Sequence, residues 1–445
     1  MDNPVSKIEL TTLKSVVRIG EVLPFKARAK DSRGKVLNNV PFSYAVSGKE
    51  DEKGAGASAM IQADGRFVAE IPGTYTVLAS SGDKSAVRTV KAIPRNVARE
   101  IEMIGHGTVR DKHTSDFWVW EGVDGRDYAV TGTWGGDGKA YFWDVTNPAD
   151  IRKIDSIQVD ARTVNDVKIS EDGTICIISR EGASSRKNGI VILDVTEPTD
   201  VKIHSTFTET LTGGVHNLFI YEDHVYALSN GQRYDIINIA DPKTPHRVGK
   251  FEIENPARAI HDVWIENGIA YSSNWNDGVI MVDVGNGIAG GSPSNPVEIA
   301  RAAVEGDANH AAFPYRSKTT GKFYIIAGDE IFPTIFFTKK DADREAFNPD
   351  GYLHFMDFTD PKNPREVARY QVPEAGSHNF WVEDDLLYIG YYNGGLRIVD
   401  ISGDLMGDLY KQGREVAHYI PKDAKGVVPN HAMTWGAQPH KGHIF

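Results

Sequence analysis

Cysteine is almost absent from this sequence, since Cys176 is the single thiol among 445 residues. One cysteine excludes an intramolecular disulfide, so the fold is stabilised without one and sulfur gives no indication of the compartment. Cys176 lies within the apolar run 174–178, which is typical of a buried strand and not of an exposed nucleophile.

Positive charge and long apolar runs are also scarce. The chain carries 49 Lys and Arg against 61 Asp and Glu, for a net charge of −12. This balance argues against a nucleic-acid partner, which needs a basic face. No apolar run approaches the ~18 residues that span a bilayer. The start, residues 1–4, has neither the basic nor the apolar region of a signal peptide. We therefore expect membrane association only through a partner or an anchor outside this sequence.

The familiar catalytic motifs are missing as well. The sequence has no Gly-x-Ser-x-Gly, no P-loop, no Gly-x-Gly-x-x-Gly after a strand and no His-Glu-x-x-His. No catalytic motif therefore identifies a class of enzyme, and any chemistry would depend on other side chains.

Residues 1–97 alternate short apolar segments with Gly/Asp turns. Segments 22–27, 42–46 and 75–79 read as antiparallel strands, and Asp64-Gly65 as a turn between two of them. About seven such strands are typical of a β-sandwich. The stretch 65–77 resembles bacterial immunoglobulin-like domains. We expect an immunoglobulin-like β-sandwich over 1–97 that serves as a spacer or docking module.

A different repeat pattern begins at about residue 98 and continues to residue 445. An apolar strand that ends in Asp or Asn returns every 43 to 53 residues, with one longer interval, often before a turn with Pro. The six copies end at Asp144, Asp194, Asn238, Asp283, Asp357 and Asp400. A repeat of this length with about four short strands and no helical periodicity is typical of a propeller blade. Because an Asp side chain can accept backbone N–H groups in a tight turn, we expect these residues to be structural.

The strand Leu396-Arg397-Ile398-Val399-Asp400 and its siblings resemble the LVIVD-repeat family of extracytoplasmic β-propellers. The His-Asn/Asp pairs at 216, 261 and 378 are similar to that family too. The resemblance covers residues 98–445. It implies a propeller and a periplasmic, cell-surface or secreted location, but no settled reaction.

A histidine at the start of the innermost strand is the second repeated feature. It occurs at His216, His261, His310, His378 and His431, with spacings of 45, 49, 68 and 53 residues. Ser115 and Asn165 fill the same position in two further copies, which gives seven blades, the last incomplete in this chain. Neither core packing nor turns require a repeated imidazole. If the ring closes, these side chains converge at one mouth of the channel.

The same mouth is predicted to carry polar and aromatic groups from the inner strands and from the loops between second and third strands. These residues are Trp134, Asn165, Arg180, Asp262, Trp275 and Glu330. Converging imidazoles suit iron, copper or zinc better than calcium or magnesium. The competing interpretation is that each histidine binds a carbonyl of the neighbouring blade and closes the ring. If the histidines are instead ligands, they occupy one arc of the ring, and the Ser115/Asn165 side is the open side of the site.

The fifth blade carries an apolar insertion that contains Phe332, Ile335, Phe336 and Phe337. It is predicted to lie over the histidine face as a pocket wall, a lid or a docking patch for a partner, or to fold back on the blade edge.

Three functions follow from the sequence. The first is an extracytoplasmic binding or scaffold protein with a histidine-ring metal site. The others are a metal-dependent oxidoreductase with iron or copper, and a structural subunit of an envelope or membrane complex that docks through the sandwich or this loop.

Overall fold

The computed structural model describes residues 5–49, 56–254, 259–306, 308–331 and 351–445. Every regular element in these ranges is a β-strand, so the predicted all-β class is confirmed. The same ranges hold no helix with the length and apolar character needed to cross a membrane. The residues Phe332, Ile335, Phe336 and Phe337 lie outside the described ranges.

The N-terminal region consists of two sheets that share one core. The first sheet contains β1 (Lys7–Thr12), β3 (Leu23–Lys30), β4 (Val36–Leu37), β6 (Ala59–Ile61) and β7 (Arg66–Ala69). The second contains β2 (Val16–Arg18), β5 (Ser43–Lys49), β8 (Gly73–Ser81) and β9 (Lys84–Ile93). Phe67 lies between them, with its ring centroid 5.8 Å from that of Phe25 and 5.7 Å from that of Tyr75.

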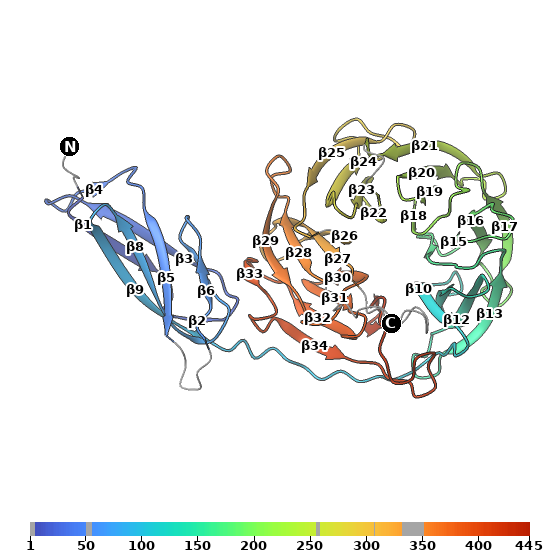
Figure 1. The fold of residues 1–445 in the computed structure, drawn as a ribbon, viewed down its shortest axis with the longest axis horizontal. Coiled ribbons are helices and arrows are strands. Elements are labelled where there is room, and N and C mark those ends of the chain that lie inside the picture. The colour runs from blue at the N-terminus through green and yellow to red at the C-terminus, as the bar shows by residue number, and fades with distance from the viewer. Residues whose placement is uncertain (1–4, 50–55, 255–258, 307, 332–350) are drawn as a thin grey trace, which may run out of the picture.

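The rest of the chain forms a ring of small sheets around a central axis (Figure 1). Six of them contain four strands in sequence order, each antiparallel to the next. The first three are β10 (His113–Glu121), β11 (Asp127–Trp134), β12 (Lys139–Asp144) and β13 (Arg152–Gln158); β14 (Val167–Ile169), β15 (Ile175–Arg180), β16 (Gly189–Asp194) and β17 (Lys202–Phe207); β18 (Leu218–Tyr221), β19 (His224–Ser229), β20 (Arg233–Asn238) and β21 (His246–Glu252).

The next three sheets continue the ring. They are β22 (Asp262–Glu266), β23 (Ile269–Ser273), β24 (Val279–Asp283) and β25 (Val297–Ala302); β26 (Asn309–Arg316), β27 (Phe323–Asp329), β28 (Leu353–Asp357) and β29 (Arg365–Tyr370), with β33 (Gly407–Asp408) added at the edge; β30 (Phe380–Glu383), β31 (Leu386–Gly390), β32 (Leu396–Asp400) and β34 (Glu415–Tyr419). A two-stranded sheet of β35 (Pro439–His440) and β36 (His443–Ile444) follows.

The third strand of each four-stranded sheet is the repeated apolar strand of the sequence. β16 is buried along almost its whole length, because neighbouring sheets cover both of its faces. β17, the outer strand of the same sheet, is largely exposed. In all six sheets the register shifts between the third and fourth strands, so the outer strand bends at the same place.

The Asp or Asn that ends each third strand accepts a backbone N–H two residues later, with N···O distances of 2.9–3.1 Å at all six copies. The predicted structural role of these residues is confirmed. Cys176 is fully buried on β15, as its apolar neighbours predict.

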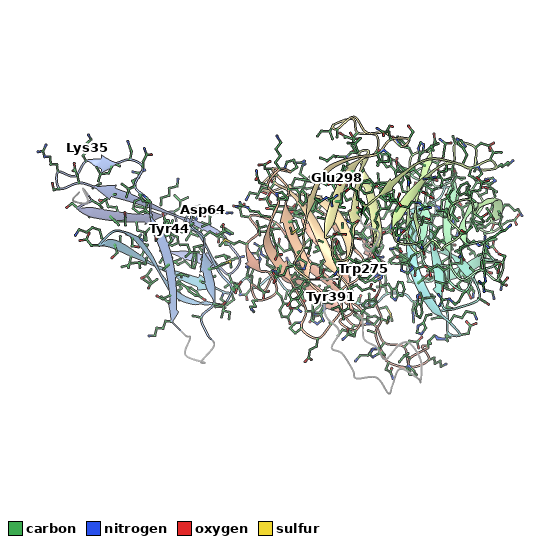
Figure 2. All side chains as sticks on the ribbon, turned by 45° about the horizontal axis from the view of Figure 1, so that its top comes forward. Lys35, Tyr44, Asp64, Trp275, Glu298 and Tyr391 are labelled. Atoms are coloured by element: carbon green, nitrogen blue, oxygen red, sulfur yellow. The ribbon has the colours of Figure 1, made fainter. Side chains whose placement is uncertain are left out.

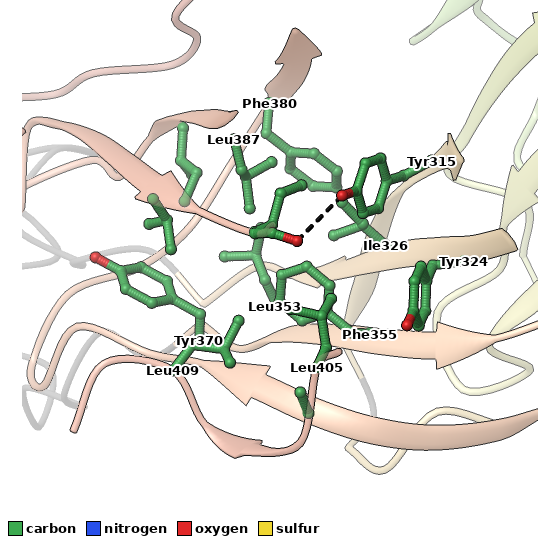
Figure 3. Packing of buried hydrophobic residues seen from close by; sticks show 14 of the residues in the cluster. Tyr315, Tyr324, Ile326, Leu353, Phe355, Tyr370, Phe380, Leu387, Leu405 and Leu409 are labelled. Atoms are coloured by element: carbon green, nitrogen blue, oxygen red, sulfur yellow. Dashed lines mark hydrogen bonds between the residues drawn. The ribbon is translucent and has the colours of Figure 1, made fainter. Parts of the chain in front are cut away.

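Adjacent sheets pack through shared apolar clusters. Between the β26 and β30 sheets, for example, Tyr315, Phe355 and Leu387 belong to one cluster. Figure 3 shows this packing, with the hydroxyl of Tyr315 donating to the carbonyl of Ile401 at 3.0 Å. Such clusters give the ring its rigidity and fix the inner strands around the axis.

The N-terminal sheets contact the ring near β33 and β34. The buried guanidinium of Arg414 donates to the carbonyl of Gly20 at 2.6 Å. Arg95 pairs with Asp400 at 2.5 Å, and the N–H of Asp408 donates to Glu70 at 2.9 Å. These contacts hold the two regions together on one side of the ring.

Candidate functional site

Four of the repeated histidines lie side by side around the ring. His216, His261 and His378 directly precede or adjoin the inner strands β18, β22 and β30, and His310 is within β26. Ring centroids are 5.1 Å apart for His216 and His261, 4.2 Å for His261 and His310, and 4.3 Å for His310 and His378. The closure of the sheets therefore brings residues far apart in sequence into one cluster.

Two of these imidazoles have a defined proton position. Nδ1 of His261 contacts the carbonyl of His310 at 3.2 Å, and Nδ1 of His378 contacts the carbonyl of Trp435 at 2.7 Å. A carbonyl oxygen only accepts, so each Nδ1 carries the hydrogen and each Nε2 keeps its lone pair. Each bond joins the histidine to the next part of the ring and, at the same time, leaves the lone pair of Nε2 available to a ligand.

Glu330, just after β27, brings a carboxylate into the cluster. Its oxygens lie 3.5 Å from Nε2 of His310 and 3.8 Å from Nε2 of His378. The hydroxyl of Tyr392 donates to it. Burial raises the pKa of Glu330 to about 7. One potential ligand atom from each of His261, His310 and Glu330 falls within 4.8 Å of the other two.

The inner imidazoles are neutral at ordinary pH. Burial, with a contribution from the neighbouring imidazoles, holds the pKa of His261 and of His310 well below the usual value. Burial likewise lowers the pKa of His378 to about 4. The buried Nδ1 of His310 has no hydrogen-bond partner among the described residues. An unpaired buried nitrogen is costly unless a ligand occupies it.

His216 differs from the other three because its side chain is 42% exposed. Its Nδ1 pairs with Glu181, and the amide of Asn165 lies 3.3 Å from its Nε2. Burial opposes the charged form, but the bond to Glu181 prevails and raises the pKa of His216. Asn165 thus holds this ring in place on the side of the cluster that the sequence predicts to be open.

The histidines face a cavity of about 370 Å³ with an aromatic wall. Its lining residues are His113, Trp134, His216, His261, Trp275, His310, Glu330, His378, Tyr392, Met433 and Trp435. A second hollow of about 520 Å³ shares His216, His261 and Trp275 with it and is also lined by Glu181 and Gly214. Trp275 lies toward the middle of the ring (Figure 2). The site therefore has room beside the imidazoles for a small ligand.

A layer of buried charges occupies the channel next to the histidines. Lys168 pairs with Asp116 at 3.0 Å and with Asp166, and its ammonium lies 5.3 Å from the ring centroid of Trp118. Burial raises the pKa of Asp262 to about 7. Asp262 lines a small hollow together with Asp116 and Lys168, and it is not among the residues that line the cavity of the histidines. The predicted rim residue Arg180 donates to the carbonyl of Asp160 at 2.8 Å and is not among the residues that line the cavity of the histidines.

The fifth predicted histidine, His431, is not among the described residues that line the cavity. Tyr392 pairs with Thr434 as Trp275 pairs with Asn309, so Trp435 takes the position of His310 in the last repeat. Its carbonyl accepts from the preceding histidine, as that of His310 does. Because Asn430-His431 resembles Asn309-His310, the sequence aligns the last repeat on His431, four residues before its position in the structure.

Several residues of the site escape a search for repeated histidines. Trp435 and Met433 carry no repeated residue type, and His113 falls before the first repeat. Glu181 and Tyr392 follow second strands, and the ring geometry predicts them at this mouth without any repeated residue type. Their partners, His216 and Glu330, become evident only from the folded contacts.

Comparison with known proteins supports the repeat. Residues 376–404, which include β30 to β32, match the family model of the LVIVD repeat. No curated protein sequence matches the chain. The chain is therefore similar to LVIVD-repeat proteins over three strands of one sheet.

Solved structures with a similar arrangement have very different sequences. The computationally designed Ika8 protein has a TM-score of 0.45 at 11% identity, over 82% of this chain and 88% of that chain. The β-propeller domain of Cps50 (Swd1) from Myceliophteria thermophila has 0.44 at 11%, over 67% and 87%. A putative 6-phosphogluconolactonase from Bacteroides fragilis has 0.45 at 12%, over 78% and 93%. The propeller-like architecture of this chain rests on its own ring of sheets and on the repeat.

Proposed function

We propose that this protein is a propeller scaffold that binds a transition metal ion at the histidine cluster. The observation that carries the proposal is the convergence of His261, His310 and Glu330, with potential ligand atoms within 4.8 Å of one another. His378 adjoins them, since its Nε2 lies 3.8 Å from Glu330. His216 completes the arc from its more exposed position.

The donor set fits a metal for two reasons. Histidine ligands commonly donate their second ring nitrogen to a backbone carbonyl, as His261 and His378 do. Their depressed pKa values keep the lone pairs available at neutral pH. Imidazole with one carboxylate suits iron, copper or zinc. With an open coordination position, such an ion would activate oxygen or peroxide if iron or copper, and water if zinc.

Metal analysis of the purified full chain, with matched histidine variants, tests this. We expect about one iron, copper or zinc ion per chain, lost in His310→Ala and kept in His246→Ala, which changes an exposed histidine on β21. Metal-free protein that takes up none of these ions, with both variants identical to wild type, would contradict the proposal.

A metal-dependent oxidoreductase is the second candidate function. It is favoured by the cavity of about 370 Å³ that directly adjoins the imidazoles and is walled by Trp134, Trp275 and Trp435. We expect the metal-loaded protein to oxidise a phenolic probe with peroxide faster than the same ion in buffer, and His310→Ala to lose this rate. Equal rates for protein and free ion would leave binding as the function.

Two further proposals concern the number of blades and the role of the N-terminal sheets. We infer that the ring has seven blades, with β35 and β36 as part of the seventh, and that the two N-terminal sheets form an immunoglobulin-like domain used for docking. An experimental structure that shows β35 and β36 outside the ring would contradict the blade count. Loss of a co-purified partner on deleting residues 1–97 would support the docking role, and its retention would count against it.

The likeness to the LVIVD repeat supports an exported location, with a structural role in an envelope complex as the third candidate. Fractionation of the native host cell tests the location. We expect the protein outside the cytoplasm, and a purely cytoplasmic pool would contradict this.

A further inference from the structure

The row of buried histidines has a tryptophan at each end. The ring centroid of Trp275 lies 4.7 Å from that of His261, and the centroid of Trp435 lies 4.7 Å from that of His378. His310 lies between the two histidines, with centroid distances of 4.2 and 4.3 Å. All five rings line the cavity of about 370 Å³. The imidazoles therefore occupy the middle of an aromatic arc that ends in an indole ring on either side.

Two aromatic residues of the cavity have a backbone conformation that bulky side chains rarely adopt. Trp275 has a φ of 44°, and Tyr392 has a φ of 32°. The two positions correspond, because each follows the second strand of its sheet and bridges to the next repeat, at Asn309 and Thr434. After β19 the loop has Asn230 with a φ of 54°, a residue type that adopts this conformation more readily.

A bulky residue with positive φ carries a conformational cost, and such outliers gather at functional sites. Local backbone preference does not account for an indole and a phenol at these two positions. Both rings line the cavity, so a ligand that contacts them would account for their presence.

The middle of the arc offers acceptor atoms. Nε2 of His378 keeps its lone pair, and the buried Nδ1 of His310 has no hydrogen-bond partner among the described residues. The carboxylate of Glu330 already accepts the phenolic hydroxyl of Tyr392. A ligand with a hydroxyl on its ring could donate to the same acceptors, or bind through its oxygen to an ion that the imidazoles hold.

We propose that this cavity binds a planar aromatic compound with a ring hydroxyl, with the ring against Trp275 and Trp435 and the hydroxyl at the imidazoles and Glu330. The inference rests on the function proposed above, because it names the ligand class of the same cavity. Aromatic rings gain from offset-stacked or edge-on contacts with one another. The cavity is near the lower end of the range for small-molecule sites, roughly 300–1,000 Å³, which suits one or two fused rings. An organic cation also binds aromatic walls, but a metal ion at the imidazoles would repel it.

Calorimetric titration of the full chain with 2-naphthol is the test. We expect saturable binding at one site with a dissociation constant below about 100 μM. The analogue 2-decalol keeps the hydroxyl but has no flat ring, and 2-methoxynaphthalene keeps the ring but has no hydroxyl hydrogen. Each should bind at least tenfold more weakly. Absence of saturable binding, equal binding of either analogue, or tighter binding of tetramethylammonium overturns the proposal.

A pair of variants locates the site. Trp275→Asn removes the indole but places at this positive φ a residue type that tolerates it, as Asn230 does, so the fold should be kept. It should weaken 2-naphthol binding at least tenfold. Tyr410→Ala, which removes a 38% exposed ring that does not line the cavity, should leave binding unchanged. Unchanged binding in Trp275→Asn, or equal weakening in both variants, overturns the proposal.

Titrations of chelator-treated and zinc-loaded protein separate this inference from the metal site, since zinc has no redox chemistry that would consume the probe. Binding of 2-naphthol by the treated protein, with its preference over both analogues intact, supports the ligand class even where metal analysis contradicts the metal site. Zinc uptake without binding of 2-naphthol by either form keeps the metal site and overturns the ligand class.

Discussion

At the scale of single residues, the histidines have two roles that do not compete. The Nδ1 of His261 bonds a carbonyl of the next sheet and that of His378 bonds the carbonyl of Trp435, which is the purely structural interpretation of the repeat. The same bond fixes the tautomer that leaves Nε2 free for a ligand. A hydrogen bond to a carbonyl is therefore no argument against a metal, and the discriminating atoms are the Nε2 nitrogens and Glu330.

Asp283 is the most heavily bonded of the six strand-ending residues. Its buried carboxylate accepts the backbone N–H groups of Gly285, Gly287, Ala289 and Gly291 at 2.7–3.1 Å. Asp283→Ala leaves these donors without an acceptor and should lower the free energy of unfolding by about 2–4 kcal/mol. Asp357→Ala, which loses one such bond, should cost about 1 kcal/mol. Chemical denaturation measures both, and equal costs would contradict this account.

The ion pairs of His354 lead us to expect that the free energy of unfolding falls in mild alkali. Burial alone would lower its pKa, but its bonds to Asp329 and Glu366, each at 3.1 Å, raise the pKa to about 9. The nearby Tyr352 ring and Arg369, which pairs with Glu366, complete its surroundings.

Because the pKa is higher in the folded state, the contribution of His354 is complete below pH ~6.5 and is lost as the pH rises through about 9. It amounts to on the order of 3 kcal/mol. Unfolding curves of wild type and His354→Gln should therefore differ at pH 6.5 and converge above pH ~9. A difference that does not change with pH would refute the ion pairs.

At the scale of elements, the inner strands fill the channel with aromatic rings. The centroid of the Trp264 ring lies 4.5 Å from that of Phe313 and 4.8 Å from that of Phe219. Trp264→Ala should cost about 3–5 kcal/mol. Trp264→Phe should cost less than about 1.5 kcal/mol, since the indole N–H has no partner among the described residues. Thermal unfolding distinguishes these, and equal shifts in Tm would contradict the packing.

The third strands were the part of the fold that the sequence predicts best. Their apolar runs and terminal Asp or Asn repeat at a nearly constant interval, and all six are found as β12, β16, β20, β24, β28 and β32. The convergence of His216, His261, His310 and His378 follows from the same period.

The repeat interval of the sequence does not predict how neighbouring sheets align with one another. The bridge from Tyr392 to Thr434 places Trp435, and not His431, beside His378, and no residue pattern in the sequence marks that bridge. The sequence also does not predict that Arg180 bonds the carbonyl of Asp160, because Asp160 lies in a loop whose path only the structure shows.

At the scale of the molecule, a few polar contacts join the N-terminal sheets to the ring. The variant with both Arg95→Ala and Glu70→Ala removes the ion pair with Asp400 and the acceptor for the N–H of Asp408. We expect residues 94–99 of this variant to be cut several-fold faster in limited proteolysis. Arg88→Ala, at an exposed position on β9, is the control. Identical cleavage rates would mean that other contacts hold the two regions.

The central claim is that the ring closes around a metal, and X-ray absorption spectroscopy of the purified full chain tests it most directly. We predict an iron, copper or zinc edge, a first shell of nitrogen and oxygen at roughly 2.0–2.2 Å, and imidazole scattering beyond it. His310→Ala should lose this signal and His246→Ala should keep it. The absence of any such edge, even after incubation with salts of the three metals, would contradict the claim.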